Sequence, residues 1–293
     1  MSRLKQASVS AVLVVTVAIP CFAQRVNRRI FVRATDAAGA AVPGLTAADF
    51  ELTDGGKRRE VTRVATDVPM RVLLLVDSTA AVGPMITSFR DALQAFSTAL
   101  DPGLEVGLIT TGGQFKVRFP PGTNRQELQS AMQSFAPESG GNTVVETMFE
   151  ADRRLFQSVP DRWPVLVIVT TDSGLTQLSG NPYERYNRFV GEYVARGGSA
   201  HAVIIRSSTI GIISAIVSNL IANTNGILET MAIGIPLPER LQAIAQRISA
   251  DRVAMTGNYE LEYSGGVKGA GAEVEVRVKR DDVRLRVSGQ RPF

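Results

Sequence analysis

The stretch that decides the fold is residues 72–81, VLLLVDSTAA, in which five aliphatic residues end at Asp77. A continuous apolar run of this length is typical of a strand buried on both faces, as in a parallel sheet covered by helices. A second run, residues 165–169 (VLVIV), is followed within a few residues by Asp172. Both runs therefore predict interior strands of one sheet, each ending close to an acidic residue.

Helical patterns separate these strands. Residues 85–100 place Met85, Phe89, Leu93, Phe96 and Leu100 on one face of a helix. Further helices are expected at 125–135, 144–156, 183–195 and 237–248, and further strands at 106–109 and 202–205. The alternating run 115–119 is expected to be an antiparallel edge strand. Strands that alternate with helices predict an α/β fold, a doubly wound and mostly parallel sheet flanked by helices.

The two ends of this region have the alternating pattern of β structure. Residues 24–69 contain the turn signal Asp54-Gly55 between short strands, and residues 274–278 and 283–287 flank a turn at Asp281-Asp282. Either β segment alone is too small to be stable. We therefore expect an N-terminal β segment (24–69), an α/β domain (70–252) and a C-terminal β hairpin (253–293) that packs with the N-terminal segment.

Residues 1–23 have the three parts of a secretory signal peptide. Arg3 and Lys5 precede the apolar run 7–19, and Cys21-Phe22-Ala23 offers small residues at the positions expected before a cleavage site. The apolar run is short for a permanent membrane span. The sequence thus predicts an exported protein, periplasmic or secreted, with no stable membrane span.

Composition excludes several classes of function. The 293 residues carry a formal net charge of only +4, without the concentrated basic face of a nucleic-acid-binding protein. His201 and Cys21 are the single histidine and the single cysteine, so neither a His-rich zinc site nor an internal disulfide can form. No G-x-S-x-G turn presents a serine nucleophile, and His201 is expected to have a structural or surface role.

The stretch 210–235 is apolar and almost uncharged. One interpretation is a buried helix followed by an apolar connection. The other is an exposed flap that contacts a partner or a membrane surface. Asn219, Asn223 and Asn225 make the stretch too polar to span a bilayer.

Four oxygen-bearing side chains are expected to converge at one edge of the sheet. Asp77 and Thr79 follow the first buried strand, Asp172 follows the second, and Thr143 precedes a helix. Loops at the carboxyl ends of parallel strands share an edge where ligands bind. Two carboxylates and two hydroxyls form a hard oxygen site that suits Mg²⁺, which commonly keeps several waters. An open position on the ion could accept a carboxylate of a partner protein.

This arrangement resembles the von Willebrand factor type A family. Its metal-ion-dependent adhesion site reads Asp-x-Ser-x-Ser on one loop, with a Thr and an Asp on two others. Asp77, Thr143 and Asp172 match three positions, Thr79 replaces the first Ser and keeps a hydroxyl, and Ala81 replaces the second and cannot bind a metal. The flanks, with Val42-Pro43-Gly44-Leu45 and Asn258-Tyr259-Glu260-Leu261, are similar to bacterial secreted "VWFA-related" proteins.

The resemblance implies a non-catalytic, exported binding or adhesion module that recognises a protein partner through an ion at this edge. Two alternatives remain open: a scaffold of the same fold that binds without metal, and a Mg²⁺-dependent hydrolase. Asp77 and Asp172 could instead cap turns or helices, because Asp favours such positions. Thr143 could equally be a helix N-cap, with Glu146 completing a capping box.

Overall fold

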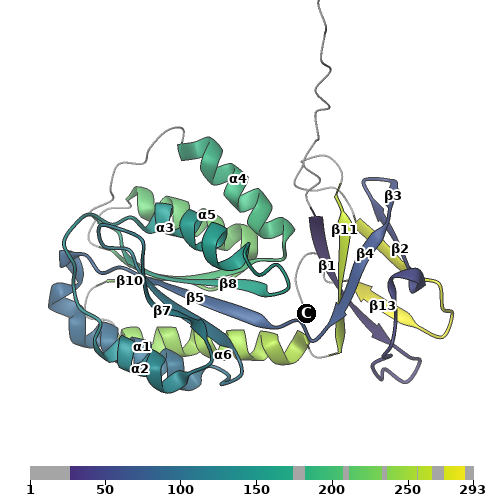
Figure 1. The fold of residues 1–293 in the computed structure, drawn as a ribbon, viewed down its shortest axis with the longest axis horizontal. Coiled ribbons are helices and arrows are strands. Elements are labelled where there is room, and N and C mark those ends of the chain that lie inside the picture. Colours follow the sequence, from purple (N-terminus) through teal and green to yellow (C-terminus); the bar gives the residue numbers. More distant parts are fainter. Residues whose placement is uncertain are drawn as a thin grey trace, which may run out of the picture.

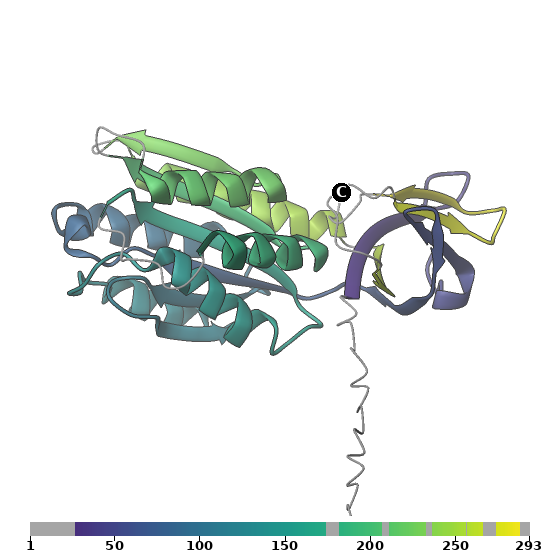
Figure 2. The ribbon, with the colours of Figure 1, turned by 90° about the horizontal axis from the view of Figure 1, so that it is seen from above.

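The structure is a computed structural model that describes residues 27–173, 182–206, 211–232, 236–255, 257–265 and 274–287. The expected signal peptide (1–23) lies outside these residues. The chain forms a sheet domain, residues 70–255, and a smaller β unit made from the segments before and after it (Figure 1). Seen from above, the two lie end to end (Figure 2).

The sheet domain is built on six strands in the order β10-β9-β8-β5-β6-β7. All neighbours are parallel except the edge strand β7, which runs antiparallel to β6. The strands are β5 (Met70–Val76), β6 (Glu105–Thr110), β7 (Lys116–Gly122), β8 (Trp163–Thr171), β9 (Ser199–Arg206) and β10 (Leu228–Ala232). The predicted α/β fold class is confirmed, including the antiparallel edge.

Helices cover both faces of this sheet, as Figure 1 shows: α1, α2 and α6 on one face and α3, α4 and α5 on the other. The helices are α1 (Ile86–Ala99), α2 (Arg125–Gln133), α3 (Val144–Ala151), α4 (Pro182–Ala195), α5 (Ile212–Thr224) and α6 (Leu237–Met255). Strand β5 shows why its sequence is a continuous apolar run. Val72, Leu74 and Val76 enter the core of the first face, whereas Leu73 and Leu75 enter the core of the second.

The β unit joins the two ends of the described chain. One sheet has the order β13-β1-β11-β4, and a second has the order β12-β2-β3. The strands are β1 (Asn27–Thr35), β2 (Phe50–Asp54), β3 (Lys57–Arg59), β4 (Val61–Thr66), β11 (Asn258–Ser264), β12 (Val274–Val278) and β13 (Arg284–Val287). The two sheets enclose a separate core that includes Phe50, Leu52, Tyr259 and Leu261.

The pairing of the last two strands differs from the expected C-terminal hairpin. The turn at Asp281-Asp282 is present, but β12 pairs with β2 and β13 pairs with β1. The turn thus carries the chain from one sheet to the other. Alternation of apolar and polar residues indicates which side chains face a core, but it does not specify which strand lies alongside.

The apolar stretch 210–235 forms helix α5 and then strand β10 over most of its length. Ile213, Val217 and Leu220 are buried against the sheet. The expected helix is therefore present, but the expected apolar connection is an edge strand that pairs in parallel with β9. Among the described residues, no helix combines the length and the apolar character needed to cross a membrane.

Candidate functional site

The candidate site lies at the carboxyl ends of the central strands, at the end of the sheet domain away from the β unit (Figure 1). Strands β5 and β8 are parallel neighbours, with Val76 opposite Val169. Asp77 and Asp172 therefore leave adjacent strands at the same edge. We call the loops 77–81, 111–113, 138–143 and 171–173, with the first turns of α4 and α5, the strand-end rim.

The Asp77 carboxylate connects two loops of the rim and is fully buried. Its Oδ1 accepts the backbone N–H of Thr79 at 2.8 Å. Its Oδ2 accepts the Thr171 N–H at 3.0 Å, the Thr171 hydroxyl, and the Asn142 side-chain amide at 3.1 Å. Three of these donors reach Oδ2 and one reaches Oδ1, so the carboxylate is held in place while Oδ1 accepts only one hydrogen bond from the described residues.

Asn142 is the residue that brings the third loop to Asp77, and sequence reasoning missed it. Its amide nitrogen also donates to the Thr170 hydroxyl at 2.8 Å. Its carbonyl oxygen accepts the Thr111 hydroxyl at 2.9 Å and the Val144 N–H at 3.1 Å. A signal was present, because an asparagine beside Thr143 carries both a donor and an acceptor. A search for metal ligands does not select it.

Thr143 lies in the expected loop, but its side chain does not make the capping box considered as the alternative to metal contact. Its hydroxyl donates to the Thr111 carbonyl at 2.7 Å and lies 3.3 Å from the Thr147 hydroxyl. No side-chain cap from Thr143 closes the first turn of α3. Asn142 does so instead by accepting the Val144 N–H, because its carbonyl oxygen reaches the helix start from one residue earlier.

Asp172 is directed to the start of α5. Its Oδ2 accepts the Gly211 N–H at 2.6 Å and the Ser214 hydroxyl at 2.5 Å, and its Oδ1 accepts the Ser214 N–H at 3.1 Å. A carboxylate at this position satisfies free backbone donors of the helix and opposes its positive dipole end. The capping alternative for Asp172 thus describes its contacts in the structure. No described hydrogen bond links Asp172 to Asp77 or Thr143 directly.

Thr79 and Ala81 complete the first loop. The Thr79 hydroxyl is buried and has no hydrogen-bond partner among the described residues. A buried hydroxyl without a partner is costly unless a ligand or water satisfies it. Ala81 is exposed, at the start of a short 3₁₀ helix, and offers no oxygen. In the described part of the chain, no three acidic, His or Cys side chains cluster as a metal site.

Glu138 pairs with two basic residues of β7 and holds Ser78 in the first loop of the rim. Ser78 donates to Glu138 Oε2 at 2.9 Å, and Glu138 also pairs with Lys116 at 2.9 Å and Arg118 at 2.5 Å. Burial raises the pKa of Glu138, but the hydrogen bonds from Lys116 and Ser78 and the charge of Arg118 outweigh it and lower this pKa to about 2. Glu138 is thus ionised at all ordinary pH values and fixes Ser78 in place.

Comparison with known proteins identifies the kind of domain that carries this site. Residues 72–175 match the sequence profile of the von Willebrand factor type A domain. Among solved structures, the von Willebrand factor type A protein from Catenulispora acidiphila is similar with a TM-score of 0.52 and 10% identity, over 92% of this chain and 74% of that one. A search of curated proteins found no match.

Two further solved structures are similar at lower scores. BatB from Bacteroides thetaiotaomicron has a TM-score of 0.48 and 13% identity, over 62% of this chain and 98% of that one. Proximal thread matrix protein 1 from the mussel byssus, with a zinc-occupied MIDAS motif, has a TM-score of 0.49 and 13% identity, over 65% of this chain and 49% of that one.

The profile match and the sheet topology together identify the class: the chain contains a von Willebrand factor type A domain. The family resemblance noted in the sequence is confirmed on this domain. Such domains mediate interactions between proteins.

Proposed function

We propose that the protein is an exported, non-catalytic binding module that recognises a protein partner at the strand-end rim. The observation that carries the proposal is the convergence of distant loops on Asp77, through Asn142 from one side and Thr171 from the other. This network holds the rim loops in one arrangement. A preorganised surface loses little conformational entropy when a partner binds.

Exposed apolar side chains beside the network support a protein partner. Tyr183, in the first turn of α4, is 72% exposed, and Ile212, in the first turn of α5, is 48% exposed. Both helices begin after the carboxyl ends of neighbouring strands, β8 and β9. Tyrosine is enriched in protein interfaces because its ring offers a large rigid contact and its hydroxyl a hydrogen bond.

The residues present fit a weakly held, mostly hydrated divalent cation. The Thr79 hydroxyl, which has no hydrogen-bond partner among the described residues, and the Thr143 hydroxyl would face the ion. Asp77 and Asp172 would supply negative charge. Ala81 leaves one position to water, and Mg²⁺ tolerates several bound waters. When bound, the ion would supply a positive charge that accepts an acidic side chain of the partner.

A metal-free version of the same binding site is the second candidate, and one observation favours it. Four hydrogen-bond donors of the chain, from Thr79, Asn142 and Thr171, already hold the Asp77 carboxylate in place. The rim loops are therefore connected without an ion. In this version the partner binds through Tyr183, Ile212 and polar rim groups alone.

The burial of Asp77 supports a non-catalytic role over the Mg²⁺-dependent hydrolase. A nucleophilic carboxylate must be accessible to the substrate. Asp77 is fully buried and its oxygens accept hydrogen bonds from Thr79, Asn142 and Thr171. A phosphatase assay on the wild type and Asp77→Asn tests this point. Release of phosphate by the wild type but not by the variant would support the hydrolase instead.

The binding function is tested by affinity capture from the exported fraction of the cells that make the protein. A partner retained by the wild type should be lost with Ile212→Glu, which places a charge on the rim. The matched control is Val253→Glu, since Val253 is 69% exposed near the end of α6, far from the rim. Loss of the partner with both variants, or with neither, would contradict binding at the rim.

Export and metal use are tested separately. If the protein is exported as proposed, its mass in the exported fraction should correspond to a chain that begins at Gln24. Calorimetry with Mg²⁺ or Mn²⁺ should raise the Tm of the wild type, and the rise should be smaller in Asp172→Asn. If the metal ions leave the Tm unchanged and the partner is still captured, the metal-free version is supported.

A further inference from the structure

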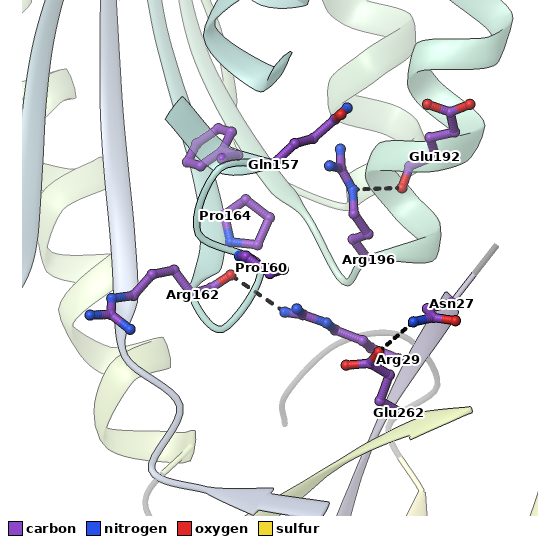
Figure 3. A pocket seen from close by; sticks show the side chains of 10 residues that line it. Asn27, Arg29, Gln157, Pro160, Arg162, Pro164, Glu192, Arg196 and Glu262 are labelled. Atoms are coloured by element: carbon purple, nitrogen blue, oxygen red, sulfur yellow. Dashed lines mark hydrogen bonds between the residues drawn. The ribbon is translucent and has the colours of Figure 1, made fainter. Parts of the chain in front are cut away.

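A pocket of about 360 Å³ lies where the β unit meets the sheet domain (Figure 3). Strands β1 and β11 form one wall, and the connection between α3 and β8 together with the end of α4 forms the other. The pocket borders Pro164 at the start of β8, whereas Asp172 follows the end of that strand. At about 3.3 Å per residue, the two sites are roughly 25 to 30 Å apart.

Arg29 is a buried cation in the wall of this pocket. Its side chain is only 5% exposed. Its Nη1 donates to the Arg162 carbonyl and to Glu260 Oε2, both at a long 3.4 Å. The N–H groups on Nε and Nη2 have no partner among the described residues. Figure 3 shows the guanidinium of Arg29 reaching from β1 toward the connection that carries Pro160 and Arg162.

Arg196 brings a second guanidinium to the same pocket from the end of α4. Its Nη2 donates to Asp152 Oδ1 at 2.5 Å and its Nε to the Glu192 carbonyl at 3.2 Å. Its Nη1 has no partner in the part of the chain that the structure describes. Burial lowers the pKa of Arg29, and the charges of Arg63 and Arg196 lower it further. Arg29 is paired with Glu260 and Arg196 with Asp152, so each guanidinium keeps only part of its hydrogen-bonding capacity for an anion in the pocket.

The acidic groups that line the pocket do not already fill this role. Glu262 is held by the Asn27 side-chain amide at 2.7 Å and by Arg63 Nε at 3.2 Å. In Figure 3 the Glu192 carboxylate points away from Arg196. The Arg162 guanidinium is turned away toward Glu105, so that Arg162 offers only its carbonyl.

We propose that this pocket binds a small organic carboxylate, with its acid group between Arg29 and Arg196. A planar guanidinium pairs with the two oxygens of a carboxylate through parallel hydrogen bonds. The rest of the ligand would lie against Phe156, Pro160 and Pro164, which give the pocket its apolar wall. The volume suits a small ligand, at the lower end of the range for such sites. This site is independent of the rim and of the function proposed for it.

Isothermal titration calorimetry on the full exported protein tests the proposal, with benzoate, succinate and inorganic phosphate as probes. At least one carboxylate should bind saturably, with a Kd below about 1 mM for a ligand of this size. Arg29→Gln removes donors to the acid group and should weaken binding roughly 10- to 100-fold. Since Arg29 also contacts Glu260, a second variant is needed that leaves the arginines in place.

Pro160→Glu places a negative charge in the exposed wall of the pocket and should weaken carboxylate binding at least about tenfold. Ser158→Glu is the matched control, because it adds the same charge to the same connection outside the pocket lining and should leave Kd unchanged. Three results would each overturn the proposal: no saturable binding of either carboxylate, equal Kd values in the two Glu variants, or binding of phosphate but of neither carboxylate.

Discussion

The rings of Phe31 and Trp163 lie with their centroids 5.8 Å apart, and this contact joins the β unit to the sheet domain. Phe31 belongs to strand β1, yet it packs in the core that contains Met70, Leu100 and Met255 rather than in the core of the β unit. Trp163 begins β8 at the end of the sheet that meets the β unit. The two units therefore share buried surface at their junction.

Phe31→Ala is expected to lower the free energy of unfolding by about 3 to 5 kcal/mol, because it leaves a cavity in that shared core. Trp163 is the single tryptophan, so its fluorescence during urea unfolding reports directly on the junction. Val287→Ala, at a side chain that is 36% exposed, is the control and should change the free energy by less than about 0.5 kcal/mol. A loss below about 1 kcal/mol for Phe31→Ala would contradict the shared core.

Asn142→Ala should destabilise the strand-end rim by about 2 to 4 kcal/mol. The change removes hydrogen bonds to Asp77, Thr170 and Thr111 and leaves buried polar groups without partners. Asn223→Ala, at an exposed position on α5, is the matched control and should have little effect. Thermal unfolding followed by circular dichroism checks both. Equal Tm values for the two variants would show that Asn142 does not connect the loops.

Ala81→Ser should strengthen divalent metal binding at the rim. The new hydroxyl supplies the oxygen that the first loop lacks, two residues after Thr79, whose hydroxyl has no partner in the described part of the chain. One added ligand is expected to lower the Kd for Mg²⁺ or Mn²⁺ roughly tenfold, measured by calorimetric titration. Ala80→Ser, also at an exposed position, is the control that should leave Kd unchanged. The same Kd in wild type and Ala81→Ser would mean that the loop does not face the ion.

His201 should make the fold sensitive to acid. The side chain is 2% exposed, and its Nδ1 accepts the Ile227 N–H at 3.0 Å. Burial and the charge of Arg247 lower its pKa to about 4, against 6.5 for an unperturbed histidine. The unfolded chain therefore binds the proton more readily between these values, and stability falls as pH decreases from about 6.5 to about 4, by roughly 3 kcal/mol.

Urea unfolding at pH 7, 5.5 and 4 checks this dependence, with His201→Gln as the comparison. The variant lacks the titrating ring, so its stability should decline less over this range. Other groups contribute to the decline in both proteins, and only the difference between them is assigned to His201. Identical pH dependence in the two proteins would show that His201 does not couple to folding.

The sheet domain could be predicted from the sequence because its signals are local. The run at 72–76 is apolar at every position, and only a strand buried on both faces requires that. Strand β10 was not predicted, since Leu228–Ala232 lies at the sheet edge with mostly exposed side chains and lacks a continuous apolar pattern. The pairing of β12 with β2 was not predicted either, because it joins residues more than 200 positions apart.

The placement of the candidate residues could be predicted, but their contacts could not. The topology of parallel strands places Asp77 and Asp172 at one edge, and this follows from their positions directly after β5 and β8. The partners of each carboxylate depend on loop conformation, which the sequence pattern does not encode. Asp172 binds the first turn of α5 at Gly211 and Ser214, about 40 residues later in the chain. Asn142 was overlooked because an amide is a weak signal in a search for ligands.

The chain enters the sheet domain from β4 and leaves it into β11, and these two strands are paired neighbours, with Thr66 opposite Tyr259. Both connections leave the β unit at the same end of this pair. If a partner bound at the strand-end rim is pulled, the tension therefore divides between two covalent connections. It then enters the β unit at one end of a single strand pair, β4 and β11. Separating the sheet domain from the β unit would therefore require both connections to be loaded at once.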